Sequence, residues 1–216
     1  MRNINFAPGE YYHVFGRGVR KSIIFQNDFE YARFIVVLLA TQSDTRLKNY
    51  TRNLRKFLKD FSPPFRGDTL KEIAKWKNVE LVAFCLMPNH FHLILREKRE
   101  GGISDYMQRV LTSTAQFINT KYKISGHVFE GPYKAVHIEN NRQMLHASAY
   151  IHRNPRELRG FKNKEEKYRW SSYRDFIDKN RFPTLLKPDV ILEQFKDKKA
   201  YKKFVETSSA KDLDSF

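Results

Sequence analysis

Two runs of strand-forming residues meet at a short turn near the middle of the chain. Residues 79–86 are rich in β-formers, and residues 90–96 open with alternating polar and apolar side chains. The residues between them, Met87-Pro88-Asn89, favour a turn because proline and asparagine interrupt strands. The pattern therefore predicts an antiparallel hairpin.

The N-terminal part adds a strand and a helix. Residues 11–15 are β-like, and Gly16-Arg17-Gly18 ends this strand. Asn27 can cap a helix over 28–42, and Glu30, three residues later, completes a capping-box pattern. Apolar residues recur on one side of this helix, which predicts a buried face.

Three further elements follow the hairpin. Ser104 can cap a long helix that ends near Gly126, and residues 134–139 form a short strand. Asn141 can begin another helix. That helix must end at about Asn154, because the following proline disfavours a helical residue before it.

The order of elements is strand, helix, two strands, helix, strand and helix. It predicts an α+β fold, a ferredoxin-like antiparallel sheet with helices on one face. We expect one domain over residues 1–160, a basic helical insert at 44–67 within it, and a helical C-terminal extension at 161–216 packed on it.

The chain carries a large positive charge. Among 216 residues, 40 are Lys or Arg and 24 are Asp or Glu, so the formal net charge is +16. Such a charge fits a polyanionic partner, and by itself it does not choose between ribosomal, DNA-handling and RNA-handling proteins.

Composition excludes several other classes. A single cysteine, Cys85, rules out an intramolecular disulfide and a cysteine-rich zinc site. The longest apolar run, 34–40, is too short to span a bilayer, and the N-terminus shows no secretory signal. We therefore expect no membrane partner and a cytoplasmic location.

Residues 46–59 form a strongly basic segment that contains no acid. Apolar residues recur through it at helical spacing, so it predicts an amphipathic helix with a positive outer face. That face either contacts nucleic acid or is simply solvated. Its cations are Arg46, Lys48, Arg52, Arg55, Lys56 and Lys59.

His90 and His92 begin the second strand of the hairpin. Residues i and i+2 of a strand point to the same face, so the two imidazoles stand side by side, as two ligands of one divalent ion do. The alternative is a solvated sheet face, since His-x-His also arises by chance. A metal site would need a third ligand from elsewhere in the fold.

Tyr150 and Asn154 share one face of the last predicted helix, because they are four residues apart. A carboxamide oxygen can complete a metal site while the phenol stands one turn away. Tyrosine is a poor nucleophile at its ordinary pKa of about 10, so it needs a metal-polarised electrophile or a base. The alternative is a half-buried tyrosine with a hydrogen-bonded hydroxyl.

Five sequence blocks stand in an order typical of one family. The stretch 87–96 holds the histidine pair, and Tyr150-Ile151-His152-Arg153-Asn154-Pro155 ends the last predicted helix. The other blocks are Tyr12-His13-Val14-Phe15-Gly16-Arg17-Gly18, Gly126-His127-Val128-Phe129 with Tyr133-Lys134, and Trp170-Ser171-Ser172-Tyr173. Together they resemble the REP-associated tyrosine transposases, a branch of the single-tyrosine HUH transposases, and the resemblance spans most of the chain.

The resemblance implies an enzyme that cleaves and joins DNA strands. His90 and His92 would bind Mg²⁺ or Mn²⁺, with Asn154 as the third protein ligand. Related transposases outside this branch have Gln at that position, and Asn is one methylene shorter. Tyr150 would attack a phosphorus of single-stranded DNA and form a 5′-phosphotyrosine, and a 3′-hydroxyl could then reverse the step.

Other residues compete for roles at the predicted site. Tyr106 and Tyr122, on the helix after the hairpin, are alternative nucleophiles whose simpler role is packing or base stacking. Glu130 and Glu139 could help the metal or accept a proton, or could be surface carboxylates.

Two histidines near the site have simpler expectations. For His13, on the first strand, and His152, off the catalytic face of the last helix, we expect structural hydrogen bonds.

By the same resemblance, the partner is single-stranded DNA whose imperfect palindrome folds as a hairpin with a short single-stranded flank. The basic insert would bind the stem of the hairpin. The protein would act in the cytoplasm, at the nucleoid of a prokaryote. It would be a monomer rather than a dimer. The predicted DNA contacts are Arg17, Arg20, Lys21, Arg52, Arg55, Lys56, Lys121, Lys123, Lys134, Arg153 and Arg156.

Two other functions stay open from the sequence. The protein could be a non-catalytic binder of hairpin DNA or RNA that kept the fold, or a metal hydrolase of small phosphoesters in which Tyr150 has no role. The histidine pair combined with Tyr150 and Asn154 favours the DNA-cleaving enzyme, because a pure binder does not need that set.

Overall fold

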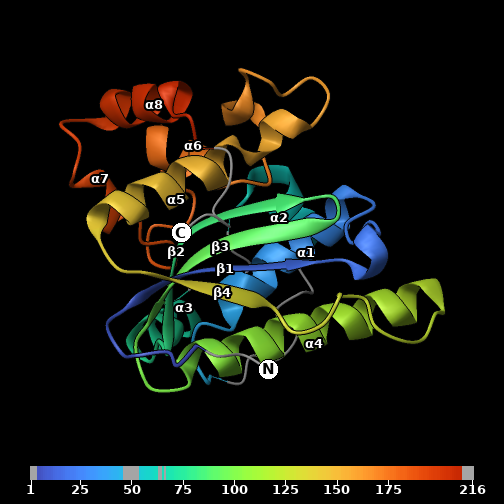
Figure 1. Ribbon diagram of the computed structural model, residues 1–216. Coiled ribbons are helices and arrows are strands. Elements are labelled where there is room, and N and C mark those ends of the chain that lie inside the picture. Colours follow the sequence, from blue (N-terminus) through green and yellow to red (C-terminus); the bar gives the residue numbers. More distant parts are fainter. Residues whose placement is uncertain (1–3, 46–53, 63–64, 66, 211–216) are drawn as a thin grey trace.

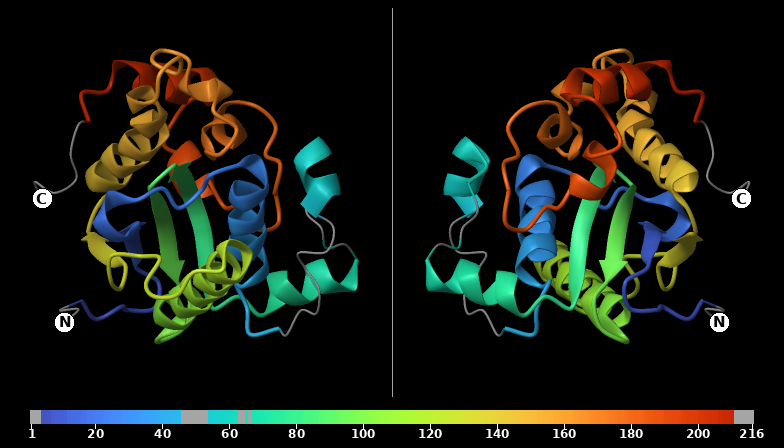
Figure 2. Two further views of the ribbon diagram at one scale, coloured as in Figure 1. Left: turned by 90° about the vertical axis from the view of Figure 1, so that its right-hand side faces the viewer. Right: turned by 90° about the vertical axis from the view of Figure 1, so that its left-hand side faces the viewer.

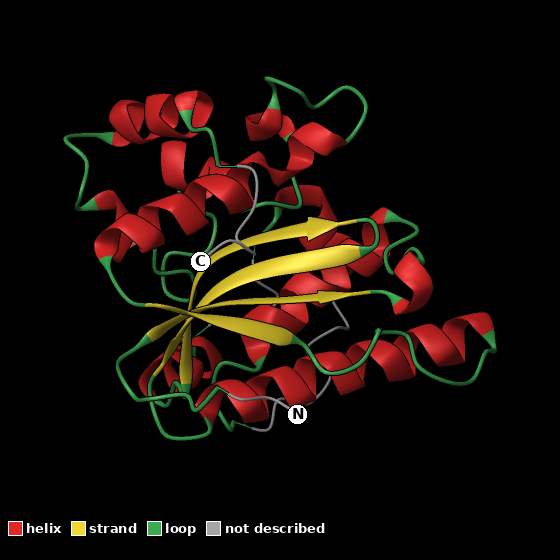
Figure 3. Ribbon diagram, viewed as in Figure 1, coloured by secondary structure: helices red, strands yellow, loops and turns green. Residues whose placement is uncertain are grey.

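A four-stranded antiparallel sheet lies at the centre of the computed structural model, which describes residues 4–45, 54–62, 65 and 67–210. The strands stand in the order β2-β3-β1-β4 (Figures 1 and 3). This order and the antiparallel pairing are those of the predicted ferredoxin-like sheet, and the hairpin of β2 and β3 is confirmed. The strands are β1 Tyr11–Arg17, β2 Val79–Met87, β3 His90–Glu97 and β4 Lys134–Ile138.

Helices surround this sheet, which confirms the α+β class. Helix α3 had no counterpart among the predicted elements, and none of the described helices is long and apolar enough to cross a membrane. The α-helices are α1 Asp28–Ala40, α2 Leu54–Asp60, α3 Asp68–Lys75, α4 Gly102–Tyr122, α5 Asn141–Arg153, α6 Tyr173–Ile177, α7 Asp189–Leu192 and α8 Lys198–Thr207. Short 3₁₀ turns span Val19–Lys21, Asn154–Glu157 and Glu165–Lys167.

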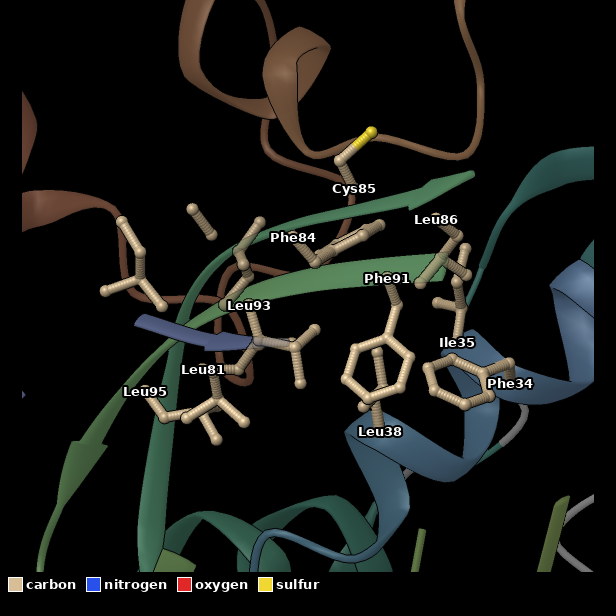
Figure 4. Close-up of a cluster of buried hydrophobic side chains, with 14 of the residues drawn as sticks. Phe34, Ile35, Leu38, Leu81, Phe84, Cys85, Leu86, Phe91, Leu93 and Leu95 are labelled. Atoms are coloured by element: carbon tan, nitrogen blue, oxygen red, sulfur yellow. The ribbon is translucent and has the colours of Figure 1, made fainter. Parts of the chain in front are cut away.

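Helices α1 and α5 pack on opposite faces of the sheet (Figure 2). Phe91 of β3 meets Phe34 of α1, with ring centroids 5.4 Å apart, in the apolar layer drawn in Figure 4. The neighbouring His90 and His92 point the other way, towards α5, because side chains alternate along a strand. One face of β3 therefore builds the core, and the other is left for polar chemistry.

The sequence predicted helices on one face of the sheet; the two crossover helices, α1 and α4, lie together on one face, whereas α5 does not. The Tyr106 hydroxyl of α4 donates a hydrogen bond to the Leu38 carbonyl of α1 at 3.0 Å. Helix α5 follows the last strand and is not a crossover helix, and it lies across the opposite face (Figure 2).

Gly16 stands directly opposite Phe91 in the pairing of β1 with β3. A Cβ atom at this position would lie 2.8 Å from two atoms of the Phe91 ring. The position therefore requires glycine, because only a residue without a side chain lets the ring lie this close to the strand.

Helix α1 begins as the sequence predicts, with one difference. The Asn27 side chain caps the helix by accepting a hydrogen bond from the Glu30 amide at 3.3 Å. The Glu30 carboxylate does not return the bond to the cap residue, as a capping box would, but accepts from the amide of Gln26 at 2.5 Å. It also accepts from Lys121 and Tyr122 of α4, so one buried carboxylate ties the start of α1 to the end of α4.

The predicted start of α4 at Ser104 is wrong. The helix begins at Gly102 after a left-handed Gly101 (φ 74°). The carboxylate of the buried Glu97 accepts from the amides of Gly102 and Ile103 at 2.9 and 2.7 Å. The Glu97 side chain, at the end of β3, thus caps the helix in place of the expected Ser104.

The C-terminal part covers the edge of β2. The Leu86 amide donates to the Trp170 carbonyl at 3.0 Å, and the Lys187 amide donates to the Leu81 carbonyl at 2.9 Å. These bonds satisfy backbone groups that an edge strand would otherwise leave open to pairing with other chains. The division between residues 1–160 and 161–216 stays a prediction.

The predicted basic helix at 46–59 falls only in part within the described residues. Its second part, residues 54–59, makes up nearly all of α2, where Leu54 and Phe57 are buried and Arg55 and Lys56 are exposed. Residues 46–53, which include Arg52, lie outside the described part of the chain. Helix α2 packs on α1, on the side away from the sheet (Figure 2).

Candidate active site

Tyr150 lies against the histidine pair within one chain. Its ring centroid is 5.2 Å from that of His92, and the centroids of His90 and His92 are 5.1 Å apart. Asn154 follows the last residue of α5, is 4% exposed, and places its Oδ1 3.0 Å from Nε2 of His90. The start of β3 and the end of α5 thus bring together the four residues predicted to form the site.

The hydrogen bonds of Asn89 assign the proton of His90. The Asn89 amide nitrogen donates to the Lys21 carbonyl at 3.2 Å, which leaves its Oδ1 2.7 Å from Nδ1 of His90. Nδ1 must donate that bond, so a neutral His90 carries a lone pair on Nε2. In the assigned amide orientation, this lone pair faces Oδ1 of Asn154, which is also an acceptor.

His92 has a buried histidine as its neighbour. Its Nδ1 lies 2.9 Å from Nε2 of His13, and the two rings stack with centroids 5.1 Å apart. When His92 donates its Nδ1 proton to His13, its Nε2 carries the lone pair that a metal ion needs. Histidines that bind metals usually have their other ring nitrogen held by a second group in this way.

Burial keeps these histidines neutral. It lowers the pKa of His13 to about 3 and the pKa of His92 well below its ordinary value. Burial also lowers the pKa of His90; the Asn154 oxygen, which would accept a bond from the protonated ring, opposes this shift, and the charge of Arg17 reinforces it. Neutral imidazole is the form that coordinates metal ions.

The side chains present fit a divalent cation. Ligands at adjacent corners of an octahedron with metal–ligand distances of about 2.1 Å lie about 3 Å apart, which is the separation of His90 Nε2 and Asn154 Oδ1. Within the described residues, no group of three or more His, Cys, Asp or Glu side chains could hold a metal ion. A site made by His90, His92 and Asn154 would use neutral ligands, which leave the positive charge of the ion available to a phosphate.

The two rival tyrosines lie on the other face of the sheet, on α4. Tyr106 is 0% exposed and its hydroxyl is bonded to a backbone carbonyl of α1. The Tyr122 hydroxyl donates to Glu30 at 2.5 Å, and this bond raises the pKa of Tyr122. Neither side chain faces the histidine pair.

Two predicted DNA contacts border the site on neighbouring strands. Arg17 of β1 stands directly opposite His90. Lys134 of β4 stands opposite Phe15, which in turn is paired with His92. Directly paired residues of antiparallel strands point to the same face, so the exposed Arg17 and Lys134 share the face of the histidines.

Arg20 and Lys21 lie beside the turn that precedes the histidines. Both are exposed, and both have left-handed backbone angles (φ 52° and 61°). The Gly18 amide donates to the Asn89 carbonyl at 2.8 Å, which ties their segment to the start of β3.

Two other predicted DNA contacts are engaged in ion pairs within the protein. Lys121 lies 2.6 Å from Glu30, and Arg156 lies 3.2 Å from Glu165. Their roles in DNA binding stay predictions, and each would have to leave or share a carboxylate to contact a phosphate.

The remaining predicted contacts differ in exposure. In Arg153, Nε and Nη1 are shielded from solvent, and no hydrogen-bond partner lies within reach among the described residues. Lys123 is exposed just after α4, and Arg55 and Lys56 are exposed on α2. Two acids considered for the site, Glu130 and Glu139, are exposed.

Two histidines of the site region have partners that the sequence did not predict. His13 was expected to make a structural hydrogen bond, but its partner, His92, is a candidate metal ligand. His152 bonds to both Ser172 and Tyr201, and burial lowers the pKa of His152 to about 3. In the sequence, the only indication of these roles was that His13 and His152 lie within the family motifs. Their partners are far away in the chain, so no local pattern could predict the contacts.

Comparison with known proteins places these residues in a family. Residues 35–154 match the family model of IS200-like transposases, a range that contains His90, His92, Tyr150 and Asn154. No curated protein matches the sequence significantly.

A solved structure of a REP-associated tyrosine transposase bound to a REP hairpin has a similar fold. Its TM-score is 0.54 at 13% sequence identity, with 88% of this chain and 92% of that chain covered. The family match spans more than half of the 216 residues, and the chain therefore belongs to the IS200-like transposases.

Proposed function

We propose that this transposase is a metal-dependent endonuclease and strand transferase that cleaves single-stranded DNA beside a hairpin. Its family already implies a DNA-cleaving enzyme. The observation that carries the finer proposal is the meeting of Tyr150 with His90, His92 and Asn154 in a single chain. A binding protein has no use for a tyrosine beside three metal-type ligands.

Tyr150 is the nucleophile in this proposal. Its hydroxyl oxygen forms a bond to the scissile phosphorus, the bond from phosphorus to the 3′-oxygen breaks, and the tyrosine proton is lost. The departing 3′-oxygen takes up a proton, and the other strand end stays attached as a 5′-phosphotyrosine. Attack by a second 3′-hydroxyl reverses these changes and joins strands, with no net loss of phosphodiester bonds.

His90, His92 and Asn154 would hold Mg²⁺ or Mn²⁺. When bound, the ion would polarise the scissile phosphate and fix its orientation. His13 orients His92 through Nδ1, and Asn89 orients His90 in the same way. The chain therefore supplies both the candidate ligands and the groups that hold them.

Hairpin DNA is the proposed partner. The REP-associated transposase of similar fold is bound to a REP hairpin, and the +16 net charge suits a polyanion. Arg17 and Lys134, which are exposed on the site face, support phosphate contacts there. One chain contains every proposed catalytic group, which supports a monomer as the active unit.

The test uses a pool of single-stranded oligonucleotides labelled at the 3′ end, each with an imperfect palindrome and randomised flanks, incubated with Mn²⁺. The proposal expects the label to appear on the protein in a denaturing gel, because the 5′ end of the labelled fragment joins Tyr150.

Two other outcomes would contradict the proposal. Binding without cleavage would favour the alternative, a non-catalytic protein that binds hairpin DNA or RNA. Cleavage that leaves no labelled protein would indicate hydrolysis by water.

A further inference from the structure

His152 and Tyr150 lie on opposite sides of helix α5. Two residues along an α-helix are about 200° apart around its axis. Tyr150 is partly buried beside the histidine pair, whereas His152 is 0% exposed on the side that packs on the C-terminal part. Whatever holds His152 therefore sets the rotation of the turn that carries Tyr150.

Both ring nitrogens of His152 are hydrogen-bonded to other elements. Nδ1 lies 2.6 Å from the hydroxyl of Tyr201 on α8, and Nε2 lies 2.9 Å from Oγ of Ser172. The ring also packs edge-on against Phe176 of α6, with centroids 4.5 Å apart.

Ser172 connects this histidine to the sheet. Its Oγ accepts from the Phe84 amide of β2 at 2.9 Å and lies 3.1 Å from the Phe84 carbonyl oxygen. The Ser172 amide donates to the same carbonyl at 2.9 Å. Ser172 is therefore hydrogen-bonded to β2, which is the hairpin partner of β3, the strand that carries His90 and His92.

One arrangement of protons satisfies every group in this network. The Ser172 hydroxyl donates to the Phe84 carbonyl, and its oxygen accepts from the Phe84 amide and from Nε2 of His152. Nδ1 then accepts from the Tyr201 hydroxyl. An apolar side chain at position 152 could make neither bond, so packing alone does not explain a histidine here.

We propose that His152 is a positioning residue, which through Ser172 and Tyr201 fixes Tyr150 relative to the histidines of β3. This inference rests on the proposed function of Tyr150 as nucleophile. It assigns a task to the C-terminal helix α8, which lies outside the family match at 35–154. A displacement of a reacting group by about 1 Å can cost about 100-fold in rate, so a small rotation of α5 would suffice.

Tyr201→Phe tests the proposal, and Tyr173→Phe is its matched control. Tyr173 stacks on His152 with centroids 5.2 Å apart, and its buried hydroxyl has no hydrogen-bond partner among the described residues. Each substitution removes one buried oxygen next to the same histidine. Only Tyr201→Phe removes a hydrogen bond to it.

The measurement is the single-turnover rate of phosphotyrosine formation at saturating DNA, with an oligonucleotide recovered from the labelled pool. We expect Tyr201→Phe to slow this step by about tenfold or more, with DNA affinity unchanged within about twofold, and Tyr173→Phe to react as the wild type does. Wild-type rates in Tyr201→Phe, or equal losses in both variants, would overturn the proposal.

Hydrogen exchange of the α5 amides provides a second readout that needs no activity. We expect faster exchange around Tyr150 in Tyr201→Phe than in Tyr173→Phe and in the wild type. Equal exchange in all three proteins would overturn the positioning role. A wild-type protein that forms no adduct would instead refute the proposed function, and the exchange comparison would still decide whether the network holds α5.

Discussion

Nε2 of His90 lies 3.0 Å from Oδ1 of Asn154, although both atoms are acceptors when His90 is neutral. Asn89 occupies the protonated nitrogen of the same ring. The lone pair of a neutral His90 and the oxygen of Asn154 are both suitable ligands, and their separation is that of two ligands of one divalent ion. This pair of atoms therefore indicates where a divalent ion would bind.

Asn154→Leu should weaken Mn²⁺ binding. The substitution removes the oxygen ligand at similar volume, and we expect the dissociation constant to rise about tenfold or more, which is about 1.4 kcal/mol. Asn154→Asp should bind Mn²⁺ more tightly, because it adds a charge to a neutral ligand set. Calorimetric titration with Mn²⁺ in the absence of DNA measures both. Equal affinities of Asn154→Leu and the wild type would exclude this residue as a ligand.

His13→Phe should weaken Mn²⁺ binding indirectly. Without Nε2 of His13, the Nδ1 atom of His92 loses its partner, and loss of such an orienting group typically costs about 10- to 100-fold in metal affinity. His13→Gln can retain a side-chain acceptor and should lose less. The readout is the rise in melting temperature on addition of Mn²⁺, with the metal-free melting temperature as control. The same rise in all three proteins would contradict an orienting role.

Tyr150→Phe should abolish the covalent adduct and leave DNA affinity within about twofold, because it removes the attacking oxygen and little else. Tyr122→Phe is the control, since it removes a hydroxyl that bonds to Glu30 on the other face of the sheet. We expect that control to keep the adduct while losing about 1 kcal/mol of stability. An adduct that disappears in Tyr122→Phe but persists in Tyr150→Phe would reverse the assignment.

Replacement of Arg55 and Lys56 by Gln should lower hairpin affinity without changing the rate of cleavage at saturating DNA. Both residues are on α2, which the sheet and α1 separate from α5, the helix that carries Tyr150 (Figure 2). Each lost phosphate contact should reduce the slope of log affinity against log salt concentration by about 0.9. Binding titrations at several salt concentrations check this, and an unchanged slope would count against the insert as a DNA contact.

Glu30→Gln should reduce the loss of folding stability that acid pH causes. Burial opposes ionisation of Glu30, but hydrogen bonds from Lys121, Tyr122 and Gln26 outweigh it and lower the pKa of Glu30 below its ordinary 4.5. The folded protein therefore binds fewer protons here than the unfolded chain. This contribution to stability is complete above pH 4.5 and is lost as the pH falls through the lowered pKa.

At neutral pH we expect Glu30→Gln to cost about 1–3 kcal/mol, because a charge-assisted bond in a buried site is weakened. Unfolding followed from about pH 6 to about pH 2 should show a shallower acid decline in the variant than in the wild type. Parallel declines would show that Glu30 is not the group that titrates.

Local patterns predicted the elements of this fold well. The Pro88-Asn89 turn, the Asn27 cap and the alternation at His90 and His92 each depend on residues a few positions apart, and the structure has all of these features. The spacing of Tyr150 and Asn154 likewise places both on one side of α5, whatever the helix packs against.

Contacts between distant segments decided the rest. Glu97 caps α4 in place of Ser104 because the end of β3 brings a buried carboxylate to the first turn of that helix. Lys121 became the partner of Glu30 because α1 and α4 lie together.

The sequence by itself determined which residues could do chemistry here: two histidines on one side of a strand, and a tyrosine and an asparagine on one side of a helix. Only the tertiary structure decided that these two sides face each other, that His13 supports His92 from 79 positions away, and that Tyr201 holds His152. The physical reason is that periodicity fixes the side of an element on which a residue lies. The partner of that side depends on strand register and on the packing of the whole core.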